Sequence, residues 1–337
     1  MRSNINKVET VCNFCGSANR SLVTQGREHE YDNTTDDLFA VVACRDCGLV
    51  YLSPRPDVSE LDTIYPPNYY SYGQQKLKEE ADPNSLLHRI RYHGFKVKIQ
   101  RALSLCPGVE PVTVLDIGCG DGHTLNLFRT FGPVKVETHG VDFNVASVEA
   151  AASCGHKTYT GRFEEVDLAG GYFDLVYASH VIEHVADPRG FTEKVQRILK
   201  PGGIFWFETP NIGSLDARLF RRKHWGAYHF PRHWFFFSPE TILKLARLAG
   251  FDVVLIDYVP NAIFWFWTCH SLIVSANPKL RKLADALFPP VDFQRDTLAN
   301  FLRICLFCSI DLLIKVCTGQ TANMIVAFRK PVSTNKS

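Results

Sequence analysis

The chain has 337 residues, of which 46% are hydrophobic and 21% charged, and 37 Lys and Arg residues nearly balance 35 Asp and Glu residues, for a net charge of +2. This length excludes a single small module, the composition excludes a disordered or fibrous protein, and the near-neutral charge argues against a protein that coats nucleic acid. The 11 cysteines are an odd number and no apolar export signal precedes them, so we expect a cytoplasmic protein rather than a disulfide-stapled secreted one.

Residues 1–60 contain two Cys-x-x-Cys pairs that are 28 residues apart, and a glycine follows each pair. Two cysteines three positions apart on a tight turn can point at one ion, and the glycine relieves steric conflict where backbone amides turn toward the thiolates. Two such turns complete a tetrahedral Zn²⁺ site that has no open position, which predicts a structural metal; a redox pair is the alternative. The predicted ligands are Cys12, Cys15, Cys44 and Cys47.

A Pro- and Tyr-rich stretch then predicts an extended connector over residues 61–84 that ends in an exposed loop. A helix should begin near Ser85 and end at Pro107-Gly108, because apolar residues recur there at steps close to 3.6. From Val112 onward short apolar runs alternate with helical ones, which is the pattern of a parallel α/β sheet covered by helices on both faces. Strands are expected at Val112–Ile117, Val136–Val141, Phe173–Ala178, Ile204–Glu208 and Phe251–Val259, and helices at 122–130, 145–153, 188–199 and 239–249.

Residues 261–319 are very apolar and precede a last expected strand at Ala322–Phe328. Neither apolar run resembles a membrane-spanning helix, because the first has about 15 residues and the second contains three charged residues. Two interpretations remain: a helical pair buried on the domain or at a homodimer contact, or a segment that lies in a membrane surface. The membrane-surface interpretation is supported by aromatic and cationic residues, which suit the headgroup layer: Trp265, Trp267, Lys279, Arg281 and Lys282.

The run from Val114 to Gly122 is a strand that leads into a glycine turn and then a helix, so backbone amides can approach a ligand closely. About 20 residues later, Asp142 ends the next strand, where a carboxylate can accept both hydroxyls of a ribose. The G-x-G-x-G spacing, with the acid Asp116 beside it, favours S-adenosylmethionine over a dinucleotide, since an acid repels a pyrophosphate but suits an amino group and a sulfonium.

These motifs together, VLDIGCGDG, GVD, YFDLVYASHVIEHVADP and LKPGG, resemble class I S-adenosylmethionine-dependent methyltransferases. The resemblance implies a doubly wound, mostly parallel, seven-stranded Rossmann-like sheet, whose last strand lies antiparallel between the fifth and the sixth. The segments CRDCGLVYLSPRP and IYPPNYYSY resemble the zinc-ribbon leader of a subgroup found in polysaccharide and other glycan biosynthesis. The expected parts are a zinc-ribbon-like domain at 1–60, the connector, a methyltransferase domain at 85–330 with the insertion 261–319, and a tail at 331–337.

The resemblance also assigns cofactor-binding residues. The methionine part would be lined by Asp116, Gly118, Cys119 and Gly120, and Gly122 would shape the turn. The ribose would be held by Asp142, and the adenine would be flanked by Phe143 and by the segment 161–164, which includes Phe163 and Glu164. Ser179 and His180 end the fourth strand, at the edge of the sheet where ligands gather.

Methyl transfer from a sulfonium needs alignment and exclusion of water, and a hydroxyl acceptor gains from a nearby base. Glu183 and His184 follow the fourth strand, and they are catalytic candidates or a helix-capping or substrate-orienting pair. The loop 225–233 adds His229 and His233 as catalytic candidates, and Arg232 as an anchor for an anionic acceptor such as a sugar nucleotide.

The sequence therefore predicts a methyltransferase that uses S-adenosylmethionine and contains structural Zn²⁺. Its expected acceptor is a small molecule or a glycan-linked group, and the expected acceptor atom is oxygen. The alternatives are a zinc-ribbon RNA methyltransferase, which the weak basicity disfavours, and a lipid or quinone methyltransferase at the inner face of a membrane. A non-catalytic scaffold is disfavoured by the intact glycine loop.

Overall fold

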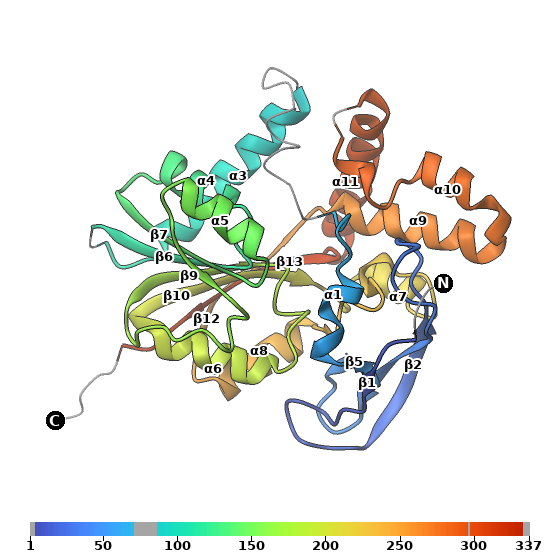
Figure 1. Ribbon diagram of the computed structural model, residues 1–337, viewed down its shortest axis with the longest axis horizontal. Coiled ribbons are helices and arrows are strands. Elements are labelled where there is room, and N and C mark those ends of the chain that lie inside the picture. Colours follow the sequence, from blue (N-terminus) through green and yellow to red (C-terminus); the bar gives the residue numbers. More distant parts are fainter. Residues whose placement is uncertain (1–3, 71–85, 109, 296, 333–337) are drawn as a thin grey trace.

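The computed structural model describes residues 4–70, 86–108, 110–295 and 297–332 (Figure 1). Most of the expected connector, residues 71–84, and most of the expected tail lie outside the described residues.

A seven-stranded sheet forms the centre of the molecule, in the order β12-β13-β10-β9-β6-β7-β8. The final strand, β13, pairs antiparallel with both of its neighbours, while the pairs among β10, β9, β6, β7 and β8 are parallel. This confirms the expected Rossmann-like sheet. Its strands are β6 (Val112–Ile117), β7 (Val136–Asp142), β8 (Lys157–Thr160), β9 (Phe173–Ser179), β10 (Leu199–Pro210), β12 (Asp252–Val259) and β13 (Asn323–Arg329).

Helices cover both faces of this sheet, and each expected helix begins and ends within about three residues of its predicted bounds. In Figure 1, α3 (Leu86–Ser104), α4 (His123–Phe131) and α5 (Val145–Ser153) lie on one face, and α6 (Pro188–Ile198) and α8 (Pro239–Leu248) on the other. Ser238 caps α8 in a reciprocal capping box with Thr241, and Pro239 occupies the first turn.

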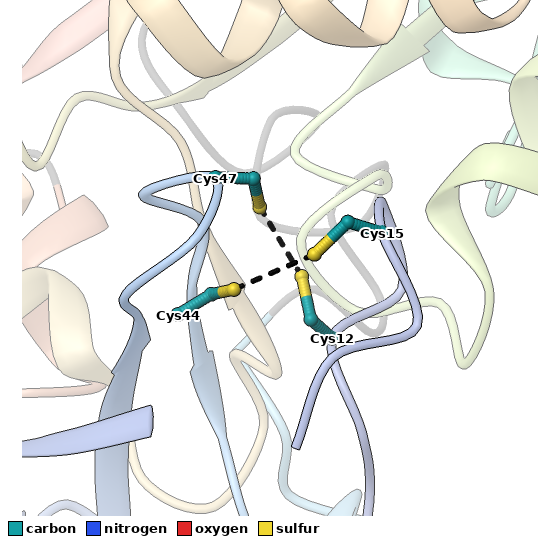
Figure 2. A group of neighbouring side chains, drawn as sticks. All are labelled: Cys12, Cys15, Cys44 and Cys47. Atoms are coloured by element: carbon teal, nitrogen blue, oxygen red, sulfur yellow. Dashed lines mark hydrogen bonds between the residues drawn. The ribbon is translucent and has the colours of Figure 1, made fainter. Parts of the chain in front are cut away.

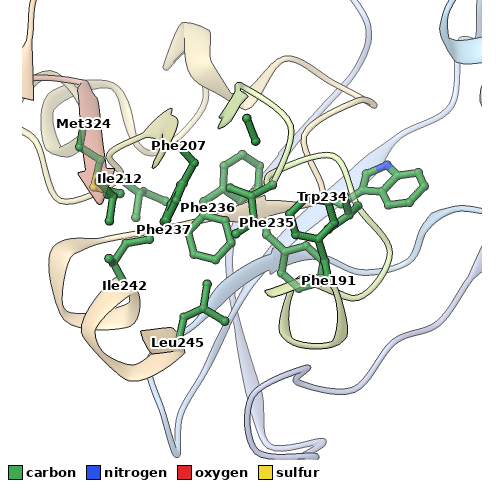
Figure 3. Packing of buried hydrophobic residues seen from close by; sticks show 14 of the residues in the cluster. Phe191, Phe207, Ile212, Trp234, Phe235, Phe236, Phe237, Ile242, Leu245 and Met324 are labelled. Carbon is green, nitrogen blue, oxygen red and sulfur yellow. The ribbon is translucent and has the colours of Figure 1, made fainter. Parts of the chain in front are cut away.

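The N-terminal module, residues 4–57, contains β2 (Arg20–Gly26), β3 (Phe39–Cys44) and β4 (Val50–Leu52), and β1 (Lys7–Val8) pairs with β5 (Arg55–Pro56). A fourth strand joins its sheet from far along the chain: β11 (Phe235–Phe236) pairs antiparallel with β4. Apolar side chains around β11 pack against α6, α8, β10 and β13, as Figure 3 shows for Phe235, Phe237, Phe191 and Phe207. The N-terminal module and the catalytic domain therefore share one hydrophobic core.

The expectation of an extended connector is wrong for residues 61–70, while the exposed loop expected at its end lies outside the described residues. A short 3₁₀ turn, η1 (Val58–Glu60), leads into α1 (Leu61–Ile64), and Ile64 and Tyr69 are buried. The aromatic side chains of this stretch pack on the catalytic domain, because the removal of their apolar area from water is favourable.

The insertion before β13 is helical, as expected, and contains α9 (Ala262–Ala276), η3 (Pro278–Leu280), α10 (Arg281–Leu287), η4 (Asp292–Gln294) and α11 (Leu298–Thr318). Helix α9 is largely buried and packs against the turn η2 (Gly226–Tyr228). Helix α11 leaves several apolar side chains exposed, among them Leu302, Leu313 and Val316. Among the helices in the described part of the chain, none combines the length and the apolarity that crossing a bilayer requires.

Candidate functional site

A cavity of about 410 Å³ lies at the carboxyl ends of β6, β7 and β9. Parallel sheets of this type bind ligands at this edge, because neighbouring strand ends diverge there and leave a crevice. One wall comes from the glycine loop, the end of β7 and the segment 161–164. A second wall comes from the segments 179–186 and 58–70, and it includes Trp234 and Ile263.

The glycine loop is held in a conformation that suits glycine. Gly118, Gly120 and Gly122 all have positive φ angles, of 74°, 52° and 84°, which side chains with a Cβ adopt at a cost. A Cβ on Gly118 would lie 2.9 Å from Val181. This loop therefore needs glycine at position 118 both for its backbone angles and for the space beside the cavity.

Asp142 lines the cavity and is fixed by the glycine loop. Its Oδ2 accepts a hydrogen bond from the amide of Gly120, and its Oδ1 accepts one from the amide of Asn144, each at 2.9 Å. Burial raises the pKa of Asp142, and these amide donors offset part of that rise. A carboxylate positioned in this way is suited to accept hydrogen bonds from a ribose, as predicted.

Three other predicted cofactor residues, in β6 and in the glycine loop itself, do not belong to the lining that the described residues form. Asp116 is buried in β6, where burial and the charge of Asp142 raise its pKa well above the ordinary value. Cys119 points toward Gly140, where a Cβ would meet its sulfur at 2.5 Å, and Gly122 packs against Ala151. In this arrangement they shape the loop.

The remaining predicted cofactor residues line the cavity: Gly118, Gly120, Phe143, Phe163, Glu164, Ser179 and His180. Phe163 is buried against Phe191, with 4.9 Å between their ring centroids, and the ammonium of Lys194 lies over its face. Phe143 is partly exposed and leans toward Tyr65 at 6.0 Å between ring centroids. Two aromatic rings therefore flank the part of the cavity expected to hold a purine.

The second wall contains tyrosines that sequence reasoning missed. Tyr65, Tyr69 and Tyr70 line the cavity with Trp234, and Tyr65 Oη lies 2.8 Å from His184 Nδ1. The available signal was the run IYPPNYY, whose aromatic density exceeds what a solvent-exposed linker needs. This wall offers an aromatic surface with a tyrosine–histidine pair.

Glu183 is fully buried behind this wall. His180 Nδ1 donates to its Oε1 at 2.9 Å, and the Thr209 hydroxyl donates to its Oε2 at 3.1 Å. Burial opposes the charge on Glu183, but the hydrogen bond from His180 and the electrostatic attraction of His180, His184 and His233 together outweigh it and lower the pKa to about 2. Burial likewise opposes a charged His180, and Glu183 overcomes it to raise the pKa of that imidazole. His180 has a φ of 54°, and strain of this kind is concentrated at functional sites.

The structure brings the predicted catalytic histidines together. The ring centroids of His184 and His233 are 4.6 Å apart, and those of His229 and His233 are 4.9 Å apart. Burial lowers the pKa of His184 to about 4 and that of His233 to about 3. Only His184 among these three belongs to the described lining of the cavity. His229 is buried, stacked on Trp267 and hydrogen-bonded to Glu30 at 2.8 Å.

Arg232 is fully buried and is not placed to anchor an anionic acceptor, so that expectation is wrong. Its Nη2 donates to Glu28 Oε2 at 2.5 Å and its Nε donates to the carbonyl of Ile64 at 2.7 Å. The guanidinium also lies 4.5 Å from the ring centroid of Tyr31. The charge of Arg232 is thus neutralised within the chain, and it ties the N-terminal module to the wall of the cavity.

Substituting Arg232→Met should therefore destabilise the protein strongly, because it leaves the buried carboxylate of Glu28 without its cation. Removal of one partner of a buried ion pair lowers the free energy of unfolding by about 3–5 kcal/mol. Denaturant unfolding monitored by tryptophan fluorescence measures the loss. The control Arg222→Met removes a cation from an exposed residue of the same loop region and should change stability by no more than about 0.5 kcal/mol; equal effects of the two substitutions would contradict the assigned role.

The four predicted metal ligands also converge, as Figure 2 shows. The sulfurs of Cys12 and Cys47 are 3.3 Å apart, those of Cys15 and Cys44 are 3.5 Å apart, and all four lie within 4.8 Å of one another. Zn–S bonds of about 2.3 Å in a tetrahedron put sulfurs about 3.8 Å apart. Gly16 and Gly48 follow the pairs with positive φ, so the donor set and its turns fit Zn²⁺.

Comparison with known proteins gives a family. A family model described as a methyltransferase domain matches residues 87–256, half of the chain. A ubiquinone biosynthesis O-methyltransferase of Cereibacter sphaeroides is 30% identical over 189 residues, which cover 53% of this chain and 76% of that protein. One from Ruegeria pomeroyi is 30% identical over 178 residues, which cover 49% and 70%.

A solved structure, an S-adenosylmethionine-dependent methyltransferase from Archaeoglobus fulgidus, aligns with a TM-score of 0.44 at 20% identity and covers 71% of this chain and 94% of its own. With the sheet order, the glycine loop and Asp142 in place, the family match shows that the chain belongs to the methyltransferase-domain family and is an S-adenosylmethionine-dependent methyltransferase.

Proposed function

We propose that the protein transfers the methyl group of S-adenosylmethionine to a hydroxyl oxygen of a small, largely apolar acceptor. The observation that carries this proposal is that Gly118 and Asp142 line the same cavity as the three tyrosines and His184. The names of the relatives, ubiquinone biosynthesis O-methyltransferases, support oxygen as the acceptor atom. The aromatic wall favours an acceptor with an apolar ring over a glycan, since rings stack on aromatic side chains.

The reaction is an in-line displacement in which a carbon–oxygen bond forms, the carbon–sulfur bond breaks and the acceptor hydroxyl loses its proton. S-adenosylmethionine supplies an electrophilic methyl group on a sulfonium that becomes a neutral thioether. Asp142 would hold the ribose, while Phe143 and Phe163 would flank the adenine. Tyr69, Tyr70 and Trp234 would exclude water, and the Tyr65–His184 pair would contact the acceptor oxygen.

For the N-terminal module we propose a structural Zn²⁺ held by the four cysteine thiolates. The fit of the sulfur spacing and the two glycine turns support it. With four thiolates the ion has no open position, so its role is to stabilise the turns that precede β2 and β4.

The function is tested by calorimetry with S-adenosylmethionine, followed by transfer of a radiolabelled methyl group to separate pools of phenolic small molecules, lipids, glycans and RNA. We expect cofactor binding and label in the phenolic or lipid pool. Label confined to glycan or RNA would overturn the acceptor assignment. Absence of cofactor binding would overturn the activity.

The substitution Tyr65→Phe should lower kcat about fivefold, because its hydrogen bond with His184, worth about 1 kcal/mol, is lost. The affinity for S-adenosylmethionine should stay unchanged, since the substitution removes only the hydroxyl and keeps the Tyr65 ring that contacts Phe143. Steady-state kinetics and calorimetry measure the two effects. The matched control Tyr92→Phe removes a hydroxyl from α3, where the ring packs against Phe131, and should leave kcat unchanged; a loss of cofactor affinity in Tyr65→Phe would contradict the assignment.

A further inference from the structure

Glu183, His184 and His233, here called the Glu183 cluster, place one carboxylate oxygen and two ring nitrogens within 4.8 Å of one another. They come from two segments, since Glu183 and His184 follow β9 and His233 precedes β11. Glu183 and His233 are buried, and His184 also lines the cavity. The cluster therefore lies directly at the cavity wall.

The hydrogen bonds of the two rings leave a lone pair on each. His233 Nδ1 lies 2.7 Å from the carbonyl of Ala227, and His184 Nδ1 lies 3.1 Å from the carbonyl of Arg232. A carbonyl oxygen only accepts, so each Nδ1 carries the hydrogen, and the Nδ1–H of His184 is shared between the carbonyl of Arg232 and Tyr65 Oη, 2.8 Å away, which both accept. Each Nε2 is therefore a potential metal ligand. Ligating histidines typically donate their other N–H to a carbonyl in this way.

The space within the cluster is too wide for a direct hydrogen bond. His233 Nε2 is 4.0 Å from Glu183 Oε1, beyond the limit of about 3.2 Å for an N–H···O bond. Metal–nitrogen and metal–oxygen bonds of about 2.1 Å would put ligand atoms about 3.4 Å apart. Shifts of roughly half an ångström per side chain would therefore close the cluster around an ion.

Other contacts already orient the carboxylate. Glu183 Oε2 accepts from Thr209 and Oε1 from His180, so the group cannot rotate away from the histidines without losing both hydrogen bonds. Two histidines and one carboxylate are a donor set for Zn²⁺, Mn²⁺ or Fe²⁺, and three ligands leave coordination positions open.

We propose that the Glu183 cluster binds a divalent transition-metal ion whose open positions face the cavity and polarise the acceptor hydroxyl. This deepens the proposed function and rests on it for the role of the ion, but not for its binding. The ion acts as a Lewis acid: it favours loss of the hydroxyl proton to solvent, after which the oxygen attacks the methyl carbon. The acceptor class is accordingly one whose hydroxyl can coordinate a metal, such as a phenol.

The experiment measures the metal content of the full-length protein after equilibration with Zn²⁺ or Mn²⁺ and removal of unbound ions. With Zn²⁺ we expect two ions per chain, one at the cysteines and one at the Glu183 cluster. His233→Ala and Glu183→Gln should each hold one, and the control His224→Ala, whose ring contacts Ser271 outside the cluster, should hold two. One ion per chain in the wild type, lost on Cys12→Ser, would overturn the proposal.

A second measurement guards against variants that fail to fold. In wild-type protein titrated with Co²⁺, the first site should show the intense charge-transfer absorption of thiolate ligands, and the second only the weak bands of nitrogen and oxygen ligands. Absence of a second, thiolate-free site would overturn the proposal. Binding of two ions without cofactor binding would uphold the metal site and overturn the proposed activity, so the two failures are distinguishable.

Discussion

The substitution Asp142→Ala should weaken the binding of S-adenosylmethionine by about 100-fold. Asp142 is the carboxylate of the cavity wall that the amides of Gly120 and Asn144 fix in place. Hydrogen bonds to a charged acceptor contribute about 1.5–3 kcal/mol each, and each 1.4 kcal/mol is a factor of ten in affinity. Isothermal titration calorimetry measures the change.

Two observations accompany this result. The control Glu149→Ala removes an exposed carboxylate from α5 and should leave the dissociation constant unchanged. Near-UV circular dichroism of Asp142→Ala should match that of the wild type if only the ligand contact is lost. Wild-type affinity in Asp142→Ala would place the cofactor elsewhere in the molecule.

The substitution Cys44→Ser, or removal of metal by a chelator, should abolish activity and destabilise the whole chain. Cys44 ends β3, and the turn after it leads into β4, which pairs with β11. Apparent binding free energies of structural zinc exceed about 10 kcal/mol in small zinc modules. Loss of the ion should therefore release β4 and β11, and with them the loop that carries His229, Arg232 and His233.

Thermal unfolding with metal analysis and methyl-transfer rates measures this effect. The matched control is Cys317→Ser, which alters an exposed thiol at the end of α11 and should change neither. Full activity in metal-free Cys44→Ser protein would show that the N-terminal module does not support the active site. The shared core and the carbonyl of Cys47, which accepts from Lys244 at 2.5 Å, make a coupled loss the expected outcome.

Local signals in the sequence predicted most of the catalytic domain. The apolar runs of β6, β9 and β10 are continuous because both faces of the sheet are covered, and Ser238 with Pro239 marks the start of α8. The strand β8 was missed because it is a short edge strand of four residues, Lys157–Thr160, whose polar and half-exposed side chains produce no apolar run. Seven strands were nevertheless expected, from the resemblance.

Local signals also predicted part of the candidate site. Residues next to strand ends, such as Gly118, Asp142 and His180, are close in space because parallel strands end at one edge of the sheet. Tyr65 was missed and Arg232 misassigned, because their roles depend on partners 119 and 204 residues away in sequence, His184 and Glu28. No local pattern encodes such a distance.

The sequence by itself determined most of the strands and helices along the chain, the glycine loop, the carboxylate at the end of β7 and the paired cysteines, since each follows from periodicity, backbone preference or short spacing. Only the tertiary structure decided that β11 completes the sheet of the N-terminal module, that Tyr65 and Tyr69 wall the cavity, and that Glu183 and His233 come together. The physical reason is that burial of aromatic area is non-directional. The segments that pack together are therefore decided by overall shape, after the local helices and strands have formed.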